Sequence, residues 1–141
     1  MYADLIVDTL TAKQRSERMA LVRSKNTKPE MVVRKLVHSM GYRYRLHVPT
    51  LPGKPDMVFP SKKAVIFVHG CFWHRHSGCK LARLPKSRLD FWFPKLNANQ
   101  ERDTRQARVL RRLGWRVMTV WECQVVKSEI LQRRITRFLG Q

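Results

Sequence analysis

The ten residues 70–79 carry two thiols, two imidazoles and two large aromatic rings, a combination that no ordinary surface loop needs. They directly follow the apolar run 64–68, which has the length and composition of a buried strand. Exposed Phe and Trp side chains lower solubility, and Cys and His at close spacing usually bind a metal ion. The fold must therefore place a compact loop of this kind at the end of a central strand, and we expect the function to lie there.

The thiols and imidazoles of this region predict a structural zinc site. The candidate ligands are Cys71, His76 and Cys79 in the loop and Cys123 after the last predicted strand. Together they complete the Cys3His tetrahedron that is typical of structural zinc. The spacing alone does not exclude His69 or His74 in place of His76, and buried or unpaired thiols are the alternative to a metal. A metal here would tie the loop to a distant strand and stabilise a small domain.

The net charge indicates a polyanionic partner. The chain has 29 Lys and Arg residues against 10 Asp and Glu, a formal charge of +19 that is spread along its whole length. Such a charge favours nucleic acid over other partners and makes binding steeply dependent on salt. We expect no membrane association, because no apolar stretch reaches transmembrane length and no lipidation motif is present. With Asp4 and Asp8 among the first apolar residues and three cysteines that cannot all pair, we expect a cytoplasmic protein without a signal peptide.

The length of 141 residues favours one domain spanning 1–141, with residues 1–11 as a mobile arm. A basic stretch at 11–25 predicts a helix that lies on phosphate. The remaining patterns predict, in order, a helix at 27–40, strands at 42–47, 57–59 and 64–68, a long helix after Pro94 that ends at Gly114, a strand at 115–121 and a helix over 130–139. We expect 57–59 and 64–68 to form a hairpin, and both 64–68 and 115–121 to be buried on both faces. The chain is therefore expected to be of the α/β class.

Asp56 is the only carboxylate between Glu30 and Asp90, where it lies among twelve Lys and Arg residues. An isolated Asp often forms a salt bridge or caps a turn. Magnesium, however, needs only one or two carboxylates, because waters and phosphate oxygens complete its octahedron. We therefore predict a magnesium ion at Asp56, where it would polarise the scissile phosphate of bound DNA.

Three further side chains are candidates for the same chemistry. His69 and His74 can activate water, because the unperturbed pKa of imidazole lies near the working pH. His69 can instead be a hydrogen-bonded core histidine, and His74 a zinc ligand or a phosphate contact. Glu30 can supply a second carboxylate to the metal, although a capping box with Thr27 explains it equally well.

Phe72, Trp73 and Trp92 are candidates for contacting bases. Aromatic side chains more often belong to the core. Phe72 and Trp73 are adjacent, however, and cannot both point inward from an extended loop. We therefore expect them to be exposed on a basic face, where they can insert between base steps and open the duplex.

Several sequence blocks together resemble the very short patch repair (Vsr) DNA mismatch endonucleases. They are Leu51-Pro52-Gly53-Lys54-Pro55-Asp56, residues 65–74, Phe91-Trp92, Glu101-Arg102-Asp103, residues 114–117 and Trp121-Glu122-Cys123. The resemblance covers about residues 15–123 and implies a restriction-endonuclease-like core of the PD-(D/E)xK superfamily, with a central mixed β-sheet flanked by helices. It implies a magnesium-dependent enzyme that nicks the T strand 5′ of the thymine in T:G mismatches, which arise when 5-methylcytosine deaminates.

By the same resemblance, Asp56 is the catalytic carboxylate, His74 the general base and His69 the second active-site histidine. The magnesium would also contact the backbone carbonyl of Val68, where the best-known members have Thr. The zinc ligands carry over to the four residues named above, and the intercalating side chains to Phe72, Trp73, Trp92 and Met19. The implied setting is a nucleoid-associated bacterial monomer, with double-stranded DNA carrying a T:G mismatch as substrate and other mismatch-repair proteins as candidate partners.

The chain also departs from the superfamily pattern. The acid-x-Lys signature would fall on residues 67–69, so its carboxylate and its Lys are missing, as is usual among Vsr proteins. One extra residue separates His76 from Cys79. Two competing interpretations remain at this point: a nuclease of the same fold that acts on another lesion or structure, and a zinc-stapled DNA-binding module without enzymatic activity.

Overall fold

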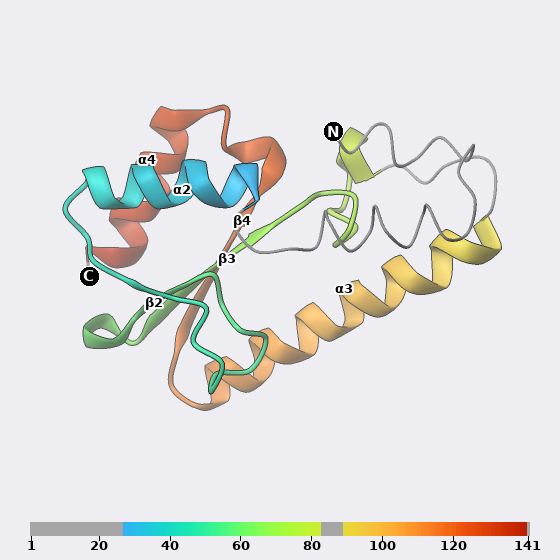
Figure 1. Ribbon diagram of the computed structural model, residues 1–141, viewed down its shortest axis with the longest axis horizontal. Helices are drawn as coiled ribbons and strands as arrows, with labels where there is room; N and C mark the ends of the chain where they lie inside the picture. The colour runs from blue at the N-terminus through green and yellow to red at the C-terminus, as the bar shows by residue number, and fades with distance from the viewer. Residues whose placement is uncertain (1–26, 83–88, 141) are drawn as a thin grey trace.

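The computed structural model describes residues 27–82 and 89–140, and its core is a four-stranded mixed sheet (Figure 1). The strands are β1 (Arg45–Leu46), β2 (Met57–Phe59), β3 (Ala64–His69) and β4 (Arg116–Trp121), in the spatial order β1-β2-β3-β4. The β1–β2 and β2–β3 pairs are antiparallel, and β3–β4 is parallel. The predicted hairpin and the predicted mixed sheet are thus confirmed.

Within the described residues, three α-helices flank this sheet and together cover both of its faces. They are α2 (Lys28–Ser39), α3 (Leu89–Arg112) and α4 (Ser128–Leu139). Figure 1 shows α2 and α4 together on one side of the sheet and the long α3 on the other. No helix in the described parts of the chain combines the length and apolarity needed to cross a membrane.

The central strand β3 distributes its side chains between the two helical layers. All six of its residues are buried, as predicted for a strand covered on both faces. Ala64, Ile66 and Val68 pack in the core with α2 and α4, whereas Val65 and Phe67 pack with Leu110 of α3. Because side chains alternate along a strand, His69 lies on the same face as Phe67 and is directed toward α3.

Three elements differ from the sequence-based expectation. The strand predicted at 42–47 is reduced to Arg45–Leu46, and it ends there because His47 has a φ of +47° and leaves the extended conformation. The strand β4 is half-buried and not fully buried, since it lies at the edge of the sheet and only Met118 and Val120 reach the core. The helix α3 begins before Pro94, so that the proline lies inside its first turns, where the loss of one N–H affects only a carbonyl near the helix start. The expected arm at 1–11, the expected helix at 11–25 and Met19 lie outside the described residues.

Candidate active site and metal centre

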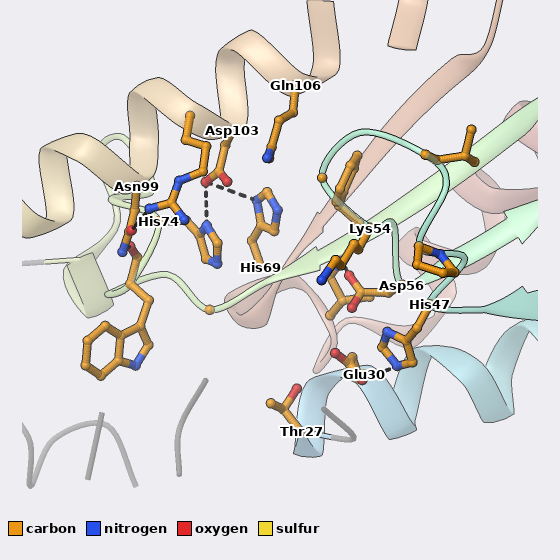
Figure 2. A pocket seen from close by; sticks show the side chains of 18 residues that line it. Thr27, Glu30, His47, Lys54, Asp56, His69, His74, Asn99, Asp103 and Gln106 are labelled. Atoms are coloured by element: carbon orange, nitrogen blue, oxygen red, sulfur yellow. Dashed lines mark hydrogen bonds and ion pairs between the residues drawn. The ribbon is translucent and has the colours of Figure 1, made fainter. Parts of the chain in front are cut away.

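A cavity of about 530 Å³ opens at the carboxyl end of β3 (Figure 2). Its walls come from the start of α2, the loop that leads into β2, the end of β3 and the middle of α3. Carboxylates and imidazoles from these separate elements line it: Glu30, His47, Asp56, His69, His74 and Asp103. The cavity therefore gathers most of the acid, base and metal-ligand candidates in one place.

Asp56 enters this cavity because of the register of the hairpin. Met57 pairs with Ile66, so the residue before β2 lies beside the end of β3, and the Asp56 Oδ2 atom accepts a 2.5 Å hydrogen bond from the backbone N–H of Val68. The pKa of Asp56 is raised to about 8, mainly by burial and also by a hydrogen bond with Glu30 and the charge of Glu30, while the Val68 N–H and Arg34 oppose the rise. In the absence of a cation, the Asp56 carboxyl group is therefore largely protonated at neutral pH.

Glu30 belongs to this site and not to a helix cap. The side chain of Thr27 makes no capping hydrogen bond, so the capping box expected as one alternative is not formed. The Glu30 side chain is buried instead and is directed toward Asp56, because the first turn of α2 packs against the end of β3. Two carboxyl groups from separate elements thus face each other, an arrangement that a cation would stabilise.

A buried arginine holds the Glu30 carboxylate in position. The Arg34 Nη2 atom lies 2.7 Å from Glu30 Oε2, one helical turn away, and 2.9 Å from His47 Nε2. The Tyr44 hydroxyl donates to the backbone carbonyl of Arg34 at 3.2 Å. Sequence reasoning gave no role to Arg34 or His47, since neither belongs to a recognisable motif.

The two histidines of the cavity stack on each other and share one carboxylate. The rings of His69 and His74 are parallel within 7°, with their centroids 3.9 Å apart. Asp103 Oδ2 accepts a hydrogen bond from His74 Nδ1 and lies 4.0 Å from His69 Nδ1. Because a carboxylate only accepts, the proton of His74 is on Nδ1 and its Nε2 is left as an acceptor. The arrangement is a His–Asp dyad with an open imidazole nitrogen.

His69 is an uncharged imidazole at neutral pH. Burial and, to a lesser extent, the charge of a protonated His74 lower its pKa to about 3, with Asp103 partly compensating. Its Nδ1 atom is buried and makes no hydrogen bond to any residue in the described ranges. This histidine can donate or accept a hydrogen bond inside the cavity, but it is not suited to carry a proton at neutral pH.

Asp103 is the site residue that sequence reasoning missed as a functional group. It lies in the long helix α3, far along the chain from both histidines, and only the packing of α3 on β3 brings it to them. The one available signal was its place in the block Glu101-Arg102-Asp103, which by itself does not distinguish a site carboxylate from a solvated one.

The second centre consists of three thiols and one imidazole. The ligand atoms of Cys71, His76, Cys79 and Cys123 all lie within 4.8 Å of one another. His76 Nδ1 lies 3.6 Å from Cys71 Sγ and 3.5 Å from Cys123 Sγ. In a zinc tetrahedron with Zn–N of about 2.0 Å and Zn–S of about 2.3 Å, the edge from nitrogen to sulfur is about 3.5 Å long. The donor set and its spacing therefore fit a tetrahedral metal ion, and His76 groups with the thiols whereas His69 and His74 do not.

The parallel pairing of β3 and β4 explains why these residues meet. His69 and Trp121 pair at the carboxyl ends of β3 and β4, and Cys71 and Cys123 each lie two residues further along the chain. The backbone N–H of Cys71 donates to Glu122 Oε1 at 3.2 Å, and the His76 ring stacks on Trp121 at 4.2 Å. The two chain segments are thus already in contact through protein groups alone. Burial raises the pKa of the Cys71 and Cys123 thiols, which are neutral until a metal ion binds them.

The aromatic side chains are buried, which contradicts the expected exposure of Phe72, Trp73 and Trp92. Their relative exposures are 0%, 3% and 1%, and the three rings contact one another edge to face. The loop after β3 is not extended: His74 N–H donates to the Gly70 carbonyl, so successive side chains can both turn inward. The indole nitrogens of Trp73 and Trp92 are buried without a hydrogen-bond partner among the described residues.

The sheet, its flanking helices and the carboxylate-lined cavity at the end of β3 define a protein of the restriction-endonuclease-like fold class. A solved structure with this fold is the catalytic domain of the homing endonuclease I-Bth0305I, with a TM-score of 0.55 over 80% of this chain and 94% of that chain. The two chains are 21% identical, so this likeness concerns the fold alone.

Sequence comparisons give the family. The family model described as DNA mismatch endonuclease Vsr matches residues 7–80. The chain is 52% identical to the type II nicking enzyme V.XorIIP of Xanthomonas oryzae pv. oryzae, over 95% of this chain and 98% of the relative. It is 42% identical to the DNA mismatch endonuclease Vsr of Escherichia coli K12, over 83% of this chain and 74% of the relative. The chain therefore belongs to the Vsr family of DNA mismatch endonucleases, and the interpretation as a DNA-binding module without activity is not supported.

Proposed function

We propose that the protein is a magnesium-dependent nicking endonuclease that cuts the T strand 5′ of the thymine in T:G mismatches and so starts very short patch repair. The observation that carries this proposal is the meeting of Asp56 and the His74–Asp103 dyad in one cavity of a nuclease fold. The family assignment supports mismatched DNA as the substrate. Because a nick in one strand needs a single active site, we propose that a monomer in the bacterial cytoplasm is the working form.

His74 acts as the general base in this proposal. Its Nδ1 proton is held by Asp103, so Nε2 is free to take a proton from the attacking water. The neutral ring of His69 packs against His74 and limits the orientations that the His74 ring can take. Asp103 and His69 thus position the base, and His74 carries the proton.

Magnesium would be held by Asp56, with Glu30 as a second carboxylate and the backbone carbonyl of Val68 as a third oxygen. The residues fit such an ion, because the buried carboxyl group of Glu30 and the half-buried carboxyl group of Asp56 face each other, and the pKa of Asp56 is raised to about 8 in its absence. When bound, magnesium supplies positive charge to the scissile phosphate and to the leaving oxygen. Asp56 must lose its proton to bind the ion, and Arg34 holds Glu30 in place while it does so.

The cysteine-rich centre would hold a structural zinc ion, bound by Cys71, His76, Cys79 and Cys123. It keeps the loop that carries His74 against the end of β4.

For Phe72, Trp73, Trp92 and Met19 we keep the proposed role of opening the duplex at the mismatch. Because the first three are buried, their insertion between base steps requires this aromatic cluster to open when DNA binds.

A nicking assay tests the proposal. End-labelled duplexes with a T:G mismatch, with matched pairs and with a branch are incubated with and without magnesium. We expect a nick 5′ of the mismatched thymine that needs magnesium, and a rate for Asp56→Asn that is lower by more than about 100-fold, as when a group that stabilises transition-state charge is lost. Glu129→Gln is the control, since this acid lies in the first turn of α4 and not in the cavity.

Equal cleavage of matched duplexes, or cleavage of branched DNA only, would show a different substrate. Cleavage without magnesium by both the wild type and Asp56→Asn would overturn the metal role.

A further inference from the structure

The cavity wall beside Asp56 carries an ammonium group that no described residue neutralises. Lys54 lines the cavity, and Figure 2 shows its side chain reaching into it from the loop before β2. In the ranges 27–82 and 89–140 the Lys54 ammonium has no hydrogen bond, ion pair or aromatic ring contact. A lysine without a partner is ordinarily only solvated. The backbone conformation of Lys54 and the contacts of its turn, however, favour a role for it in the cavity.

The backbone at Lys54 is in an unfavourable conformation. Its φ is +46°, in the left-handed region that non-glycine residues avoid, and the next residue is Pro55, which further restricts the residue before it. Backbone strain of this kind persists only where the surroundings impose it, and it concentrates at functional sites. The strain at Lys54 directs its side chain into the cavity.

Contacts of the preceding residue, Gly53, hold Lys54 in this left-handed conformation. Lys54 N–H closes a turn onto the Leu51 carbonyl at 3.1 Å. Gly53 has a φ of +77°, and a Cβ atom there would lie 2.9 Å from Gln106 Oε1 of α3 and 3.2 Å from Phe67 Cε1 of β3. The turn therefore packs closely against α3 and β3, and this packing fixes the position of the Lys54 Cα atom.

The guanidinium groups in and beside the cavity already have side-chain partners. Arg34, beside the cavity, contacts Glu30 and His47, and Arg102, which lines it, donates from Nη2 to Asn99 Oδ1 at 2.6 Å. Residue 69, where the acid-x-Lys signature would place a lysine, is a histidine. The reacting phosphate gains negative charge on its equatorial oxygens in the transition state and needs a fixed positive charge beside them. Among the described residues of the cavity, Lys54 alone offers an uncommitted ammonium for this task.

We propose that Lys54 is a catalytic residue that binds a non-bridging oxygen of the scissile phosphate and supplies the positive charge that residue 69 does not. This inference rests on the proposed function, since it requires the phosphate to lie between Asp56 and His74. It assigns the loop at 51–56 two tasks, the metal ligand Asp56 and the phosphate contact Lys54, which one rigid turn holds at a constant separation.

Lys54→Met, Lys54→Arg and Lys63→Met provide the test. Lys63 is a matched control because it has the same left-handed backbone, with a φ of +51°, but lies in the β2–β3 turn at the other end of the sheet. Single-turnover nicking of a T:G duplex should fall about 10²- to 10³-fold in Lys54→Met, the usual effect of losing one donor to a developing oxyanion. Lys54→Arg should restore most of the rate, and Lys63→Met should behave as the wild type.

Binding to a duplex with a methylphosphonate at the cleaved position adds a readout that does not depend on turnover. This group removes the phosphate charge, so it should weaken binding by the wild type and by Lys63→Met but not by Lys54→Met. Equal weakening in all three proteins, or a nicking rate of Lys54→Met equal to that of Lys63→Met while Asp56→Asn is inactive, would overturn the role of Lys54. If Asp56→Asn also nicks normally, the proposed function itself fails.

Discussion

The side chains of the cavity owe their chemical state to burial and to neighbours from other elements. Asp56 keeps its proton because it is buried beside Glu30, and His74 keeps an open Nε2 because Asp103 holds its other nitrogen. In each case the partner comes from a different helix. The protonation of Asp56 and the orientation of His74 thus depend on contacts that local sequence does not show.

Asp103→Asn tests whether the rate depends on the orientation of the His74 ring, because the variant keeps His74 itself. The amide can donate to Nδ1 as well as accept, so it no longer selects the tautomer in which Nε2 accepts a proton. We expect the single-turnover rate to fall at least about 100-fold, the lower range of what general base catalysis contributes. Glu101→Gln, an exposed acid two positions earlier on α3, should have no effect. A normal rate in Asp103→Asn would remove the dyad from the mechanism.

The raised pKa of Asp56 predicts a stability that depends on pH. A carboxyl group whose pKa rises from 3.8 to about 8 on folding binds more protons in the folded than in the unfolded state, so it stabilises the protein at low pH. This contribution is lost progressively as the pH rises from about 4 to about 8. Asp56→Asn cannot titrate. We compare the melting temperatures of Asp56→Asn and the wild type in magnesium-free buffer without a chelator. The difference, variant minus wild type, should be at least about 4 °C larger at pH 8 than at pH 5.

The parallel pair formed by β3 and β4 is the element on which both centres depend. Cys71 and Cys123 follow its two carboxyl ends, and the loop between Cys71 and Cys79 carries His74 into the cavity. A metal bound to these ends would therefore stabilise the position of the base as well as the fold. On α2, the ion pair between Glu30 and Arg34 holds in place the wall of the cavity that this helix forms.

Loss of one thiol should weaken this element without changing the cavity residues. We expect the wild type to contain one zinc ion per chain and Cys123→Ser to contain less. The melting temperature of Cys123→Ser should fall by at least about 10 °C, because the free energy of metal binding contributes to folding. Zinc content by atomic absorption and thermal unfolding provide the measurements. Ser77→Ala, which changes an exposed side chain in the same loop, should keep both values. Full zinc content with normal melting would exclude Cys123 as a ligand.

At the scale of the whole molecule, local patterns predicted the elements better than the contacts between them. The hairpin of β2 and β3 follows from two short apolar runs joined by a turn, and the helix at 27–40 follows from helical spacing; both patterns depend on neighbouring residues only. The capping box of Glu30 was wrong because packing of α2 against a distant strand draws Glu30 into the cavity, and the exposure of Trp73 was wrong because the loop after β3 forms a turn and is not extended. Asp103 was missed for the same reason. The edge position of β4 also depends on sheet order, which no single strand encodes.

The charge of +19 predicts how the molecule as a whole meets its substrate. Lys and Arg side chains along the chain would contact phosphates without regard to base sequence, and each such contact would release counterions. We expect the logarithm of the binding constant to fall with the logarithm of salt concentration with a slope of about −5 to −9, as for 6 to 10 phosphate contacts. Fluorescence anisotropy of magnesium-free protein with T:G and matched duplexes gives this slope. Both duplexes should show the same slope and differ only by a constant factor, because the mismatch is recognised through bases and not through phosphates. A slope shallower than about −2, or one that differs between the duplexes, would mean that the positive charge serves another purpose than holding the DNA backbone.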